Sequence, residues 1–167
     1  SMKRQLPDFP DLGSFLDHLA AIGQLVRSAQ PVSVVHDLTE VHRRLLLDKG
    51  PALLVEKPVL ADGRISGVPV LVNLFGTRER IAMALGCGPQ GLGQLADMLA
   101  WLRQPEPPDD LRQALALVPA MKAALATRPT GAWHVPVQEI VHTGGDIDLS
   151  ALPIQTHWPG EPAPLVT

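Results

Sequence analysis

The sequence has no tyrosine, three phenylalanines, three tryptophans and one cysteine in 167 residues. A single cysteine cannot form an internal disulfide or a thiolate zinc cage, which excludes a disulfide-stapled secreted fold and a cysteine-based zinc module. No apolar run reaches the ~20 residues that a transmembrane helix requires. We therefore expect a cytoplasmic protein without a membrane span.

An excess of charge of one sign is also missing. Lysine and arginine total 14, aspartate and glutamate total 17, and the formal net charge is −3. Binding to a phosphate backbone needs a face rich in lysine and arginine, and here the basic residues are scattered along the chain. Nucleic acid is therefore not an expected partner.

Proline, by contrast, is abundant. The chain has 17 prolines, about twice the usual frequency. Ten of them lie from Pro105 onward, and four of these lie between Pro153 and Pro164. Proline fixes φ and removes a backbone donor, so we expect the end of the chain to be extended rather than helical.

The first half of the chain carries the start and stop signals of two helices. Asp11 can cap a helix that Gly23 ends, and between them apolar residues recur at helical spacing: Leu12, Phe15, Leu16, Leu19 and Ile22. A second helix is predicted from Asp37, which with Glu40 has the spacing of a capping box, to the stop at 50–51.

Short apolar runs bounded by glycine and proline predict strands, at 25–26, 32–35, 52–56 and 68–74, with a turn at 61–63. Further helices are predicted at about 77–85, 90–103 and 109–118, the last with a continuation over 119–126, and a further strand from Val135, Val137, Ile140 and Val141. The predicted fold class is α+β: a small mixed sheet with several packed helices, followed by an extended Pro-rich C-terminal segment.

We predict a domain boundary near residue 128. Residues 1–128 would form an N-terminal α+β domain whose part from about 90 to 128 is a helical connector, and 129–167 would begin a second domain. The chain stops on an apolar, β-prone stretch without a polar tail, so we expect a longer protein. In isolation, residues from about Trp133 should be poorly ordered or paired with a neighbouring molecule.

Several residues could carry chemistry, and each also has a structural interpretation. None of the six histidines forms the i, i+4 pair of a helical zinc site, which favours surface or capping roles for His18, His36, His42, His134, His142 and His157. We expect Asp146 and Asp148 to form a turn, since two carboxylates are too few for a cation site. Cys87 is expected to be a structural thiol, and Trp158 an interface or core residue.

The stretch from Gly86 to Gly91 has the spacing G-x-G-x-x-G. A dinucleotide site needs a strand directly before the first glycine, so that the pyrophosphate meets the N-terminus of the next helix. Here a helix is predicted on both sides. This favours a helix-to-helix loop, with a nucleotide-binding oxidoreductase as an alternative.

Taken together, seven stretches resemble one family. They follow one another along the chain as GPALLVE at 50–56, VLVNLFGT at 70–77, RIAMALG at 80–86, PEPP at 105–108, DIDL at 146–149, LPIQT followed by WP at 152–159, and PLVT at 164–167. These stretches are similar to the UbiD family of decarboxylases, and the resemblance covers nearly the whole chain.

The resemblance implies an enzyme that removes the carboxylate of an aromatic or α,β-unsaturated acid with prenylated FMN, a divalent metal such as Mn²⁺ and K⁺. The nearest likeness is to the members of ubiquinone biosynthesis, which implies 4-hydroxy-3-polyprenylbenzoate as the substrate. It further implies that the rest of the polypeptide packs on this part, that the full protein is a homo-oligomer, and that its lipid-like substrate brings it to the membrane periphery.

The resemblance places one residue of this chain near the cofactor. Thr167 matches a family position beside the flavin pocket, whereas Asn73 does not correspond to the metal-binding asparagine of the family. No catalytic or metal-ligating residue is carried over, because those family residues follow the motif that ends at Thr167. The 167-residue chain alone is therefore expected to be inactive. His157 departs from the cysteine that ubiquinone-pathway members often carry.

A different class of function is the alternative. The Pro-rich C-terminal stretch could serve as an exposed ligand in a non-catalytic binding or scaffold module. Pro159 and Pro162 give one PxxP match, with Trp158 before it. No flanking Arg or Lys accompanies the match, although such motifs usually have one.

Overall fold

The structure is a computed structural model that describes residues 9–88, 90–103 and 138–161, with single positions between them at 115, 118, 121, 122, 125, 131, 133 and 135. The predicted helices over 109–118 and 119–126 and the PEPP connector therefore lie outside the described residues, apart from those single positions. The chain forms two compact units, Ser1–Pro89 with Ile147–Thr167 and Gln90–Asp146, which we call unit 1 and unit 2.

Helix α1, Leu12–Ala21, begins and ends as predicted. The Asp11 carboxylate accepts a hydrogen bond from the backbone N–H of Ser14 at 2.7 Å, which satisfies one of the free donors of the first turn. Gly23 follows the helix at φ +72°, a left-handed conformation that glycine adopts without steric cost.

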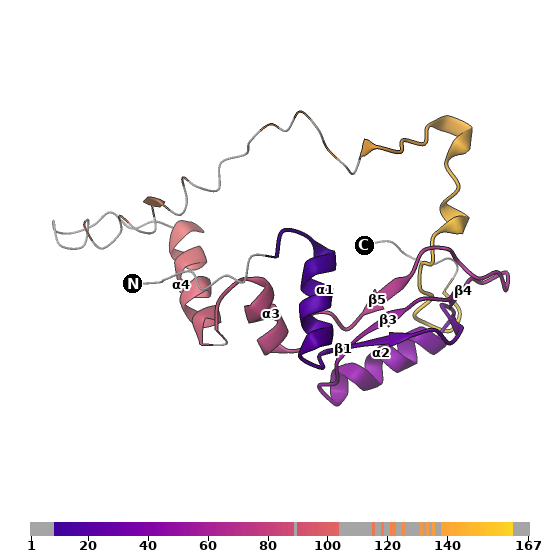
Figure 1. The fold of residues 1–167 in the computed structure, drawn as a ribbon, viewed down its shortest axis with the longest axis horizontal. Coiled ribbons are helices and arrows are strands. Elements are labelled where there is room, and N and C mark those ends of the chain that lie inside the picture. Colours follow the sequence, from indigo (N-terminus) through magenta and orange to yellow (C-terminus); the bar gives the residue numbers. More distant parts are fainter. Residues whose placement is uncertain are drawn as a thin grey trace. The chain divides into compact units, whose positions relative to one another are not determined.

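A three-stranded mixed sheet forms the centre of unit 1 (Figure 1). Strand β1, Leu25–Ser28, pairs in parallel with β3, Ala52–Val55, and β3 pairs in antiparallel with β5, Val70–Val72. The α+β prediction is confirmed.

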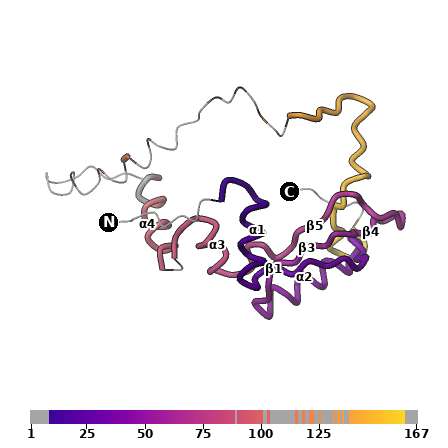
Figure 2. Tube along the Cα trace, in the orientation of Figure 1, coloured from indigo at the N-terminus to yellow at the C-terminus, as the bar shows by residue number. Residues whose placement is uncertain are grey.

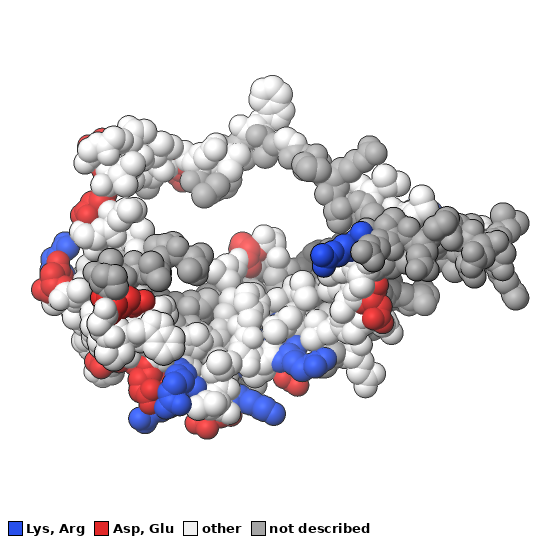
Figure 3. Space-filling view, turned by 180° about the vertical axis from the view of Figure 1, so that it is seen from behind, with Lys and Arg blue, Asp and Glu red and all other residues white. Residues whose placement is uncertain are grey.

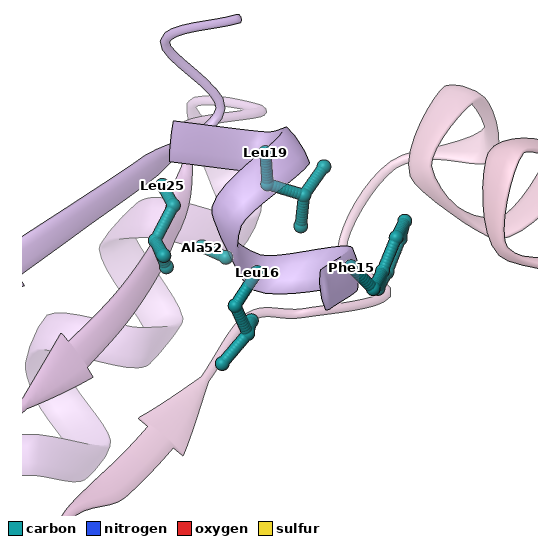
Figure 4. Packing of buried hydrophobic residues seen from close by; sticks show 5 residues of the cluster. All are labelled: Phe15, Leu16, Leu19, Leu25 and Ala52. Carbon is teal, nitrogen blue, oxygen red and sulfur yellow. The ribbon is translucent and has the colours of Figure 1, made fainter. Parts of the chain in front are cut away.

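One helix packs on each face of this sheet, because the side chains of a strand point alternately to its two faces. Helix α2, Asp37–Leu47, lies on the side opposite α1 (Figure 1). The cluster on the α1 side is Phe15, Leu16, Leu19, Leu25 and Ala52 (Figure 4). The cluster on the α2 side is Val34, Leu38, Val55 and Val72.

The predicted capping box of α2 is wrong. The residue before the first helical turn is His36, at φ +65° and without a side-chain capping bond. The Glu40 carboxylate is instead bonded to Arg43 and Arg44, each with a closest N–O distance of 2.8 Å. The Asp37 N–H, to which Glu40 would bond in a capping box, donates to the carbonyl of Val35 at 2.8 Å.

The Glu40 interactions predict an acid-sensitive contribution to helix stability. Hydrogen bonds from Arg43 and then Arg44 lower the pKa of Glu40 from its ordinary 4.5 to about 2. Because the folded value is the lower one, the contribution is present above pH 4.5 and is lost as pH falls towards 2. All three side chains are largely exposed, so the effect should be small.

The check is urea unfolding of wild type and Glu40→Gln across this acid range. The stability difference between the two proteins should shrink as the pH falls. A difference that stays constant over the range would contradict the assigned interaction.

A second, two-stranded sheet lies beside the first. Strand β2, Val32–Ser33, pairs in parallel with β4, Pro58–Val59, and Val59 also forms an antiparallel bridge to Ile65 across the predicted turn. The sequence pattern predicted β2 but not β4. A two-residue strand that begins with proline carries no alternation by which it could be recognised.

The remaining helices agree with the prediction, but the last strand does not. Helix α3 spans Arg78–Ala84 and α4 spans Gly91–Arg103. Residues 138–143 form a turn and irregular chain, so the strand expected at Ile140 and Val141 is wrong there, while Val137 lies outside the described residues. Short 3₁₀ turns follow at Gly144–Asp146 and Leu149–Ala151.

The sequence predicted that the protein has no membrane span and no strongly basic face. Within the described part of the chain, every helix is too short or too polar to cross a membrane. Figure 3 shows acidic and basic side chains interspersed on one face of the molecule.

Candidate functional site

The segment 153–161, which we call the return segment, belongs to unit 1 and pairs with the N-terminal part of that unit (Figure 2). Thr156 forms a parallel bridge with Val35. Its N–H donates to the carbonyl of Val34 at 3.0 Å, and its carbonyl accepts from the N–H of His36 at 3.1 Å. The expectation of disorder or intermolecular pairing is therefore wrong for this segment, because Val34 and His36, in the chain between β2 and α2, supply its backbone partners.

Side chains of α2 add to this pairing. The Thr39 hydroxyl lies 3.4 Å from each of three atoms, namely the Gln155 Oε1, the Thr156 carbonyl oxygen and the His157 Nδ1. A hydroxyl has one proton to donate, so the two oxygens share it or alternate, while His157 Nδ1 can accept or donate according to its tautomer. Thr39 is thus the polar centre of the contact between α2 and the return segment.

The return segment ends in a turn. Gly160 has φ +83°, the N–H of Glu161 donates to the carbonyl of Trp158 at 3.2 Å, and the Glu161 carboxylate accepts from the N–H of His157 at 2.8 Å. A polyproline helix needs an extended backbone with φ near −75°. The turn at Trp158–Glu161 therefore does not favour the PxxP interpretation, whose second proline, Pro162, lies outside the described residues.

The loop 73–77, which has the sequence NLFGT and precedes α3, is held by buried polar groups. Asn73 has φ +58° and is 4% exposed. Its side-chain amide donates to the carbonyls of Gly50 and Pro51 at 3.0 Å each. Asn73 thus ties the loop to the chain before β3, a structural role.

Arg80 supports the same loop from helix α3. Its side chain is fully buried, and its guanidinium donates to the carbonyl of Leu74, the side-chain carbonyl of Gln24 and the carbonyl of Asn73, each at 2.9 Å. Burial lowers the pKa of Arg80, and the neighbouring Glu79 opposes that shift. The sequence did not predict the burial of Arg80, because an arginine in a short amphipathic helix is expected to lie on the exposed face.

Gly76 allows the loop to close on Asn73. A Cβ atom added to Gly76 would lie 1.9 Å from Asn73 Oδ1 and 2.6 Å from Asn73 Cγ. Oδ1 is also a buried acceptor without a hydrogen-bond partner among the described residues. The tight loop leaves Phe75 at its apex 56% exposed.

The structure places most of the other predicted residues in structural roles. Asp148 caps the 3₁₀ turn Leu149–Ala151 by accepting from the Ser150 N–H at 2.9 Å, as expected of a turn former, and Asp146 lies in the preceding 3₁₀ turn. Trp158 is 71% exposed in its turn. Thr167 lies outside the described residues.

The glycine-rich stretch is a helix-to-helix loop, as predicted. Helix α3 ends at Ala84, Leu85 caps it and Gly86 follows, and α4 begins at Gly91. The partly buried thiol of Cys87 lies in this loop. The alternative of a dinucleotide site is wrong, because no strand feeds the first glycine.

The described residues do not fit a metal site. Within them, no three His, Cys, Asp or Glu side chains converge as a metal ion requires. Their buried polar residues are Ser66, Asn73 and Arg80. Ser66 accepts from the Val68 N–H, while Asn73 and Arg80 donate to backbone carbonyls and the Gln24 side chain. The buried polar side chains of this α+β domain therefore bind its own backbone and side chains.

Comparison with known proteins identifies that domain. The family model for the 3-octaprenyl-4-hydroxybenzoate carboxy-lyase N-terminal domain, UbiD_N, matches residues 16–99, which include both sheets, the NLFGT loop and α3. The fold and this match assign the matched residues to the N-terminal domain of a class of carboxy-lyases. The chain belongs to the UbiD family, as its sequence motifs predicted.

Two solved structures share the fold. The first is an evolved dimeric form of the UbiD-class enzyme HmfF from Pelotomaculum thermopropionicum, in complex with prFMN. Its sequence is 25% identical to that of this chain, and the match covers 92% of this chain with a TM-score of 0.60. HmfF from the same organism in complex with FMN is 24% identical, with a TM-score of 0.58 over the same share. The chain spans only 29% and 28% of the length of those proteins.

Proposed function

We propose that this chain is the N-terminal domain of a prenylated-FMN-dependent decarboxylase that acts on an aromatic acid, 4-hydroxy-3-polyprenylbenzoate in ubiquinone biosynthesis. The observation that carries the proposal is the UbiD_N match over residues 16–99. The fold shared with a UbiD-class enzyme in complex with prFMN supports the cofactor. The substrate rests on the likeness of the sequence motifs to ubiquinone-pathway members.

In this proposal, the cofactor supplies the chemistry, and the N-terminal domain positions the polypeptide segment that leads to the cofactor site. When bound, prenylated FMN together with Mn²⁺ and K⁺ would supply the electron sink that loss of CO₂ needs. The described residues contain no cluster of metal-ligating side chains, and we propose that the site for these groups lies in the region that follows. Thr167, six residues after the last described position, is the one residue of this chain that we propose to lie beside the flavin.

The contribution of the domain itself is a fixed geometry at the start of that region. The predicted boundary near residue 128 remains part of the proposal, with 129–167 entering the flavin-binding domain. The return segment would then lie within that domain while its backbone pairs with Val34 and Val35 of the N-terminal domain. Such pairing would fix the direction in which the chain continues towards Thr167. We further propose a homo-oligomer, supported by the dimeric HmfF structure.

The experiment is a decarboxylation assay on the longer protein read from the same coding sequence beyond Thr167. With prenylated FMN and Mn²⁺ supplied, it should release CO₂ from 4-hydroxy-3-polyprenylbenzoate. CO₂ release from other aromatic acids alone would overturn the substrate and retain the class. Failure on all aromatic and α,β-unsaturated acids by a flavin-loaded protein would contradict the class.

A further inference from the structure

His36, in the chain between β2 and α2, has a strained backbone. Its φ of +65° and ψ of −41° lie near the γ-turn of positive φ, which is rare and strained for a residue with a Cβ atom. The Asp37 N–H closes this turn by donating to the carbonyl of Val35 at 2.8 Å, which is the bond between residues i and i+2 that defines a γ-turn. Such a conformation persists only where the surrounding structure enforces it.

The return segment fixes the chain on both sides of His36. The Thr156 N–H donates to the carbonyl of Val34 at 3.0 Å, and the Thr156 carbonyl accepts from the N–H of His36 at 3.1 Å. After the turn, the Thr39 hydroxyl lies 3.4 Å from the same carbonyl oxygen, and Leu38 is fully buried under α2. His36 therefore takes the one conformation that joins these two fixed parts of the chain.

The sequence at this point also encodes a helix start without that strain. In a capping box, the Asp37 carboxylate would accept from the Glu40 N–H, and the Glu40 carboxylate would accept from the Asp37 N–H. In the structure, the Glu40 N–H donates to the carbonyl of His36 at 2.9 Å, and the Asp37 N–H closes the γ-turn. The two helix starts thus compete for the same two N–H groups.

We propose that docking of the return segment and the γ-turn at His36 form one two-state device. The docked segment holds His36 at positive φ. When the segment leaves, His36 relaxes to negative φ, and Asp37 becomes the N-cap of α2. The strain weakens docking, so the segment is released while the central sheet stays folded. The inference concerns this chain alone and does not depend on the proposed decarboxylase function.

The first test is a pair of substitutions at His36 in the 167-residue chain. Glycine adopts positive φ without steric cost, whereas alanine removes the imidazole but keeps the Cβ atom and the strain. Strain of this kind disfavours a conformation by roughly 5- to 150-fold, and the freedom of glycine in the unfolded chain offsets part of the gain.

The readout of this pair is amide hydrogen exchange at Ala52. Its N–H is bonded to the Gln24 carbonyl at 2.9 Å and reports opening of the central sheet. Because relief of strain stabilises the docked, folded chain, His36→Gly should raise the protection of Ala52 about ten-fold. His36→Ala should not raise it.

The second test repeats the pair with the return segment released. Thr156→Pro removes the N–H that bonds the Val34 carbonyl, and protection of Ala52 shows that the sheet remains folded. In this background His36 is already relaxed, so His36→Gly should no longer raise the protection of Ala52. NMR couplings that report φ should place His36 of Thr156→Pro at a negative value.

Release without unfolding also predicts that the Thr156 N–H of the wild-type chain exchanges faster than the Ala52 N–H. Exchange of Thr156 no faster than that of Ala52 would overturn the device, as would an equal gain from His36→Ala. A gain from His36→Gly that persists in Thr156→Pro, or positive φ at His36 after release, would do the same. If Thr156→Pro does not fold, the His36 pair and the wild-type exchange rates decide.

Discussion

Replacing Arg80 with methionine should destabilise unit 1 by at least about 3 kcal/mol. The guanidinium is fully buried and is the donor to two backbone carbonyls and the Gln24 side chain. Methionine fills a similar volume but leaves these acceptors without partners in a site that water does not reach. Since small domains are stable by only about 5–15 kcal/mol, the loss should be visible as a large shift of the urea midpoint followed by circular dichroism.

Two substitutions separate the hydrogen bonds from the charge. Arg80→Lys keeps the charge but cannot reach three separate acceptors with one ammonium, so it should be nearly as destabilising. Arg78→Met, at an exposed position of the same helix, should leave the midpoint nearly unchanged. If Arg80→Lys had the wild-type urea midpoint, the hydrogen bonds from Arg80 to the loop would contribute little to the stability of unit 1.

Gly76→Ala should cost about 2–4 kcal/mol. The added methyl would overlap Asn73, whose amide cannot rotate away without losing its bonds to the Gly50 and Pro51 carbonyls. Gly67→Ala is the matched control, since a Cβ at Gly67 meets no atom within 4 Å. That variant should be neutral or slightly stabilising, because it reduces the freedom of the unfolded chain.

A double-mutant cycle tests the cause. Asn73→Gly removes the overlapping side chain and suits the backbone at φ +58°, although it loses the two amide bonds. In that background, Gly76→Ala should cost less than about 1 kcal/mol, so the two changes should be strongly non-additive. Additive costs would mean that the clash with Asn73 is not what makes Gly76 necessary.

Local signals in the sequence predicted the elements that local physics controls. Helix α1 has a capping aspartate, helical spacing and a terminal glycine, and all three act in the structure as expected. The dense apolar runs became β3 and β5 because both faces of the sheet are covered. The motif resemblance predicted the family, which the comparison over residues 16–99 shows.

The errors have two sources, a competing local interaction and pairing with distant residues. Glu40 had the spacing to cap α2, but it bonds Arg43 and Arg44 one turn further along the same helix. Arg80 is buried because carbonyls from the loop before it and from Gln24 converge on its guanidinium. Thr156 is paired with Val35, between β2 and α2 and more than a hundred residues earlier, and no periodicity in 153–161 indicates that partner. Such tertiary pairings carry no signal in a single sequence.

The central claim is that this chain supplies the domain scaffold of a UbiD-type decarboxylase while the flavin site lies in the region beyond it. The most direct measurement is titration of the 167-residue chain with prenylated FMN and Mn²⁺, followed by the flavin absorbance and by the cofactor retained after desalting. We predict that the chain alone stays folded and retains no flavin, whereas the longer protein retains it stoichiometrically. Tight, stoichiometric binding by the 167-residue chain would contradict the claim.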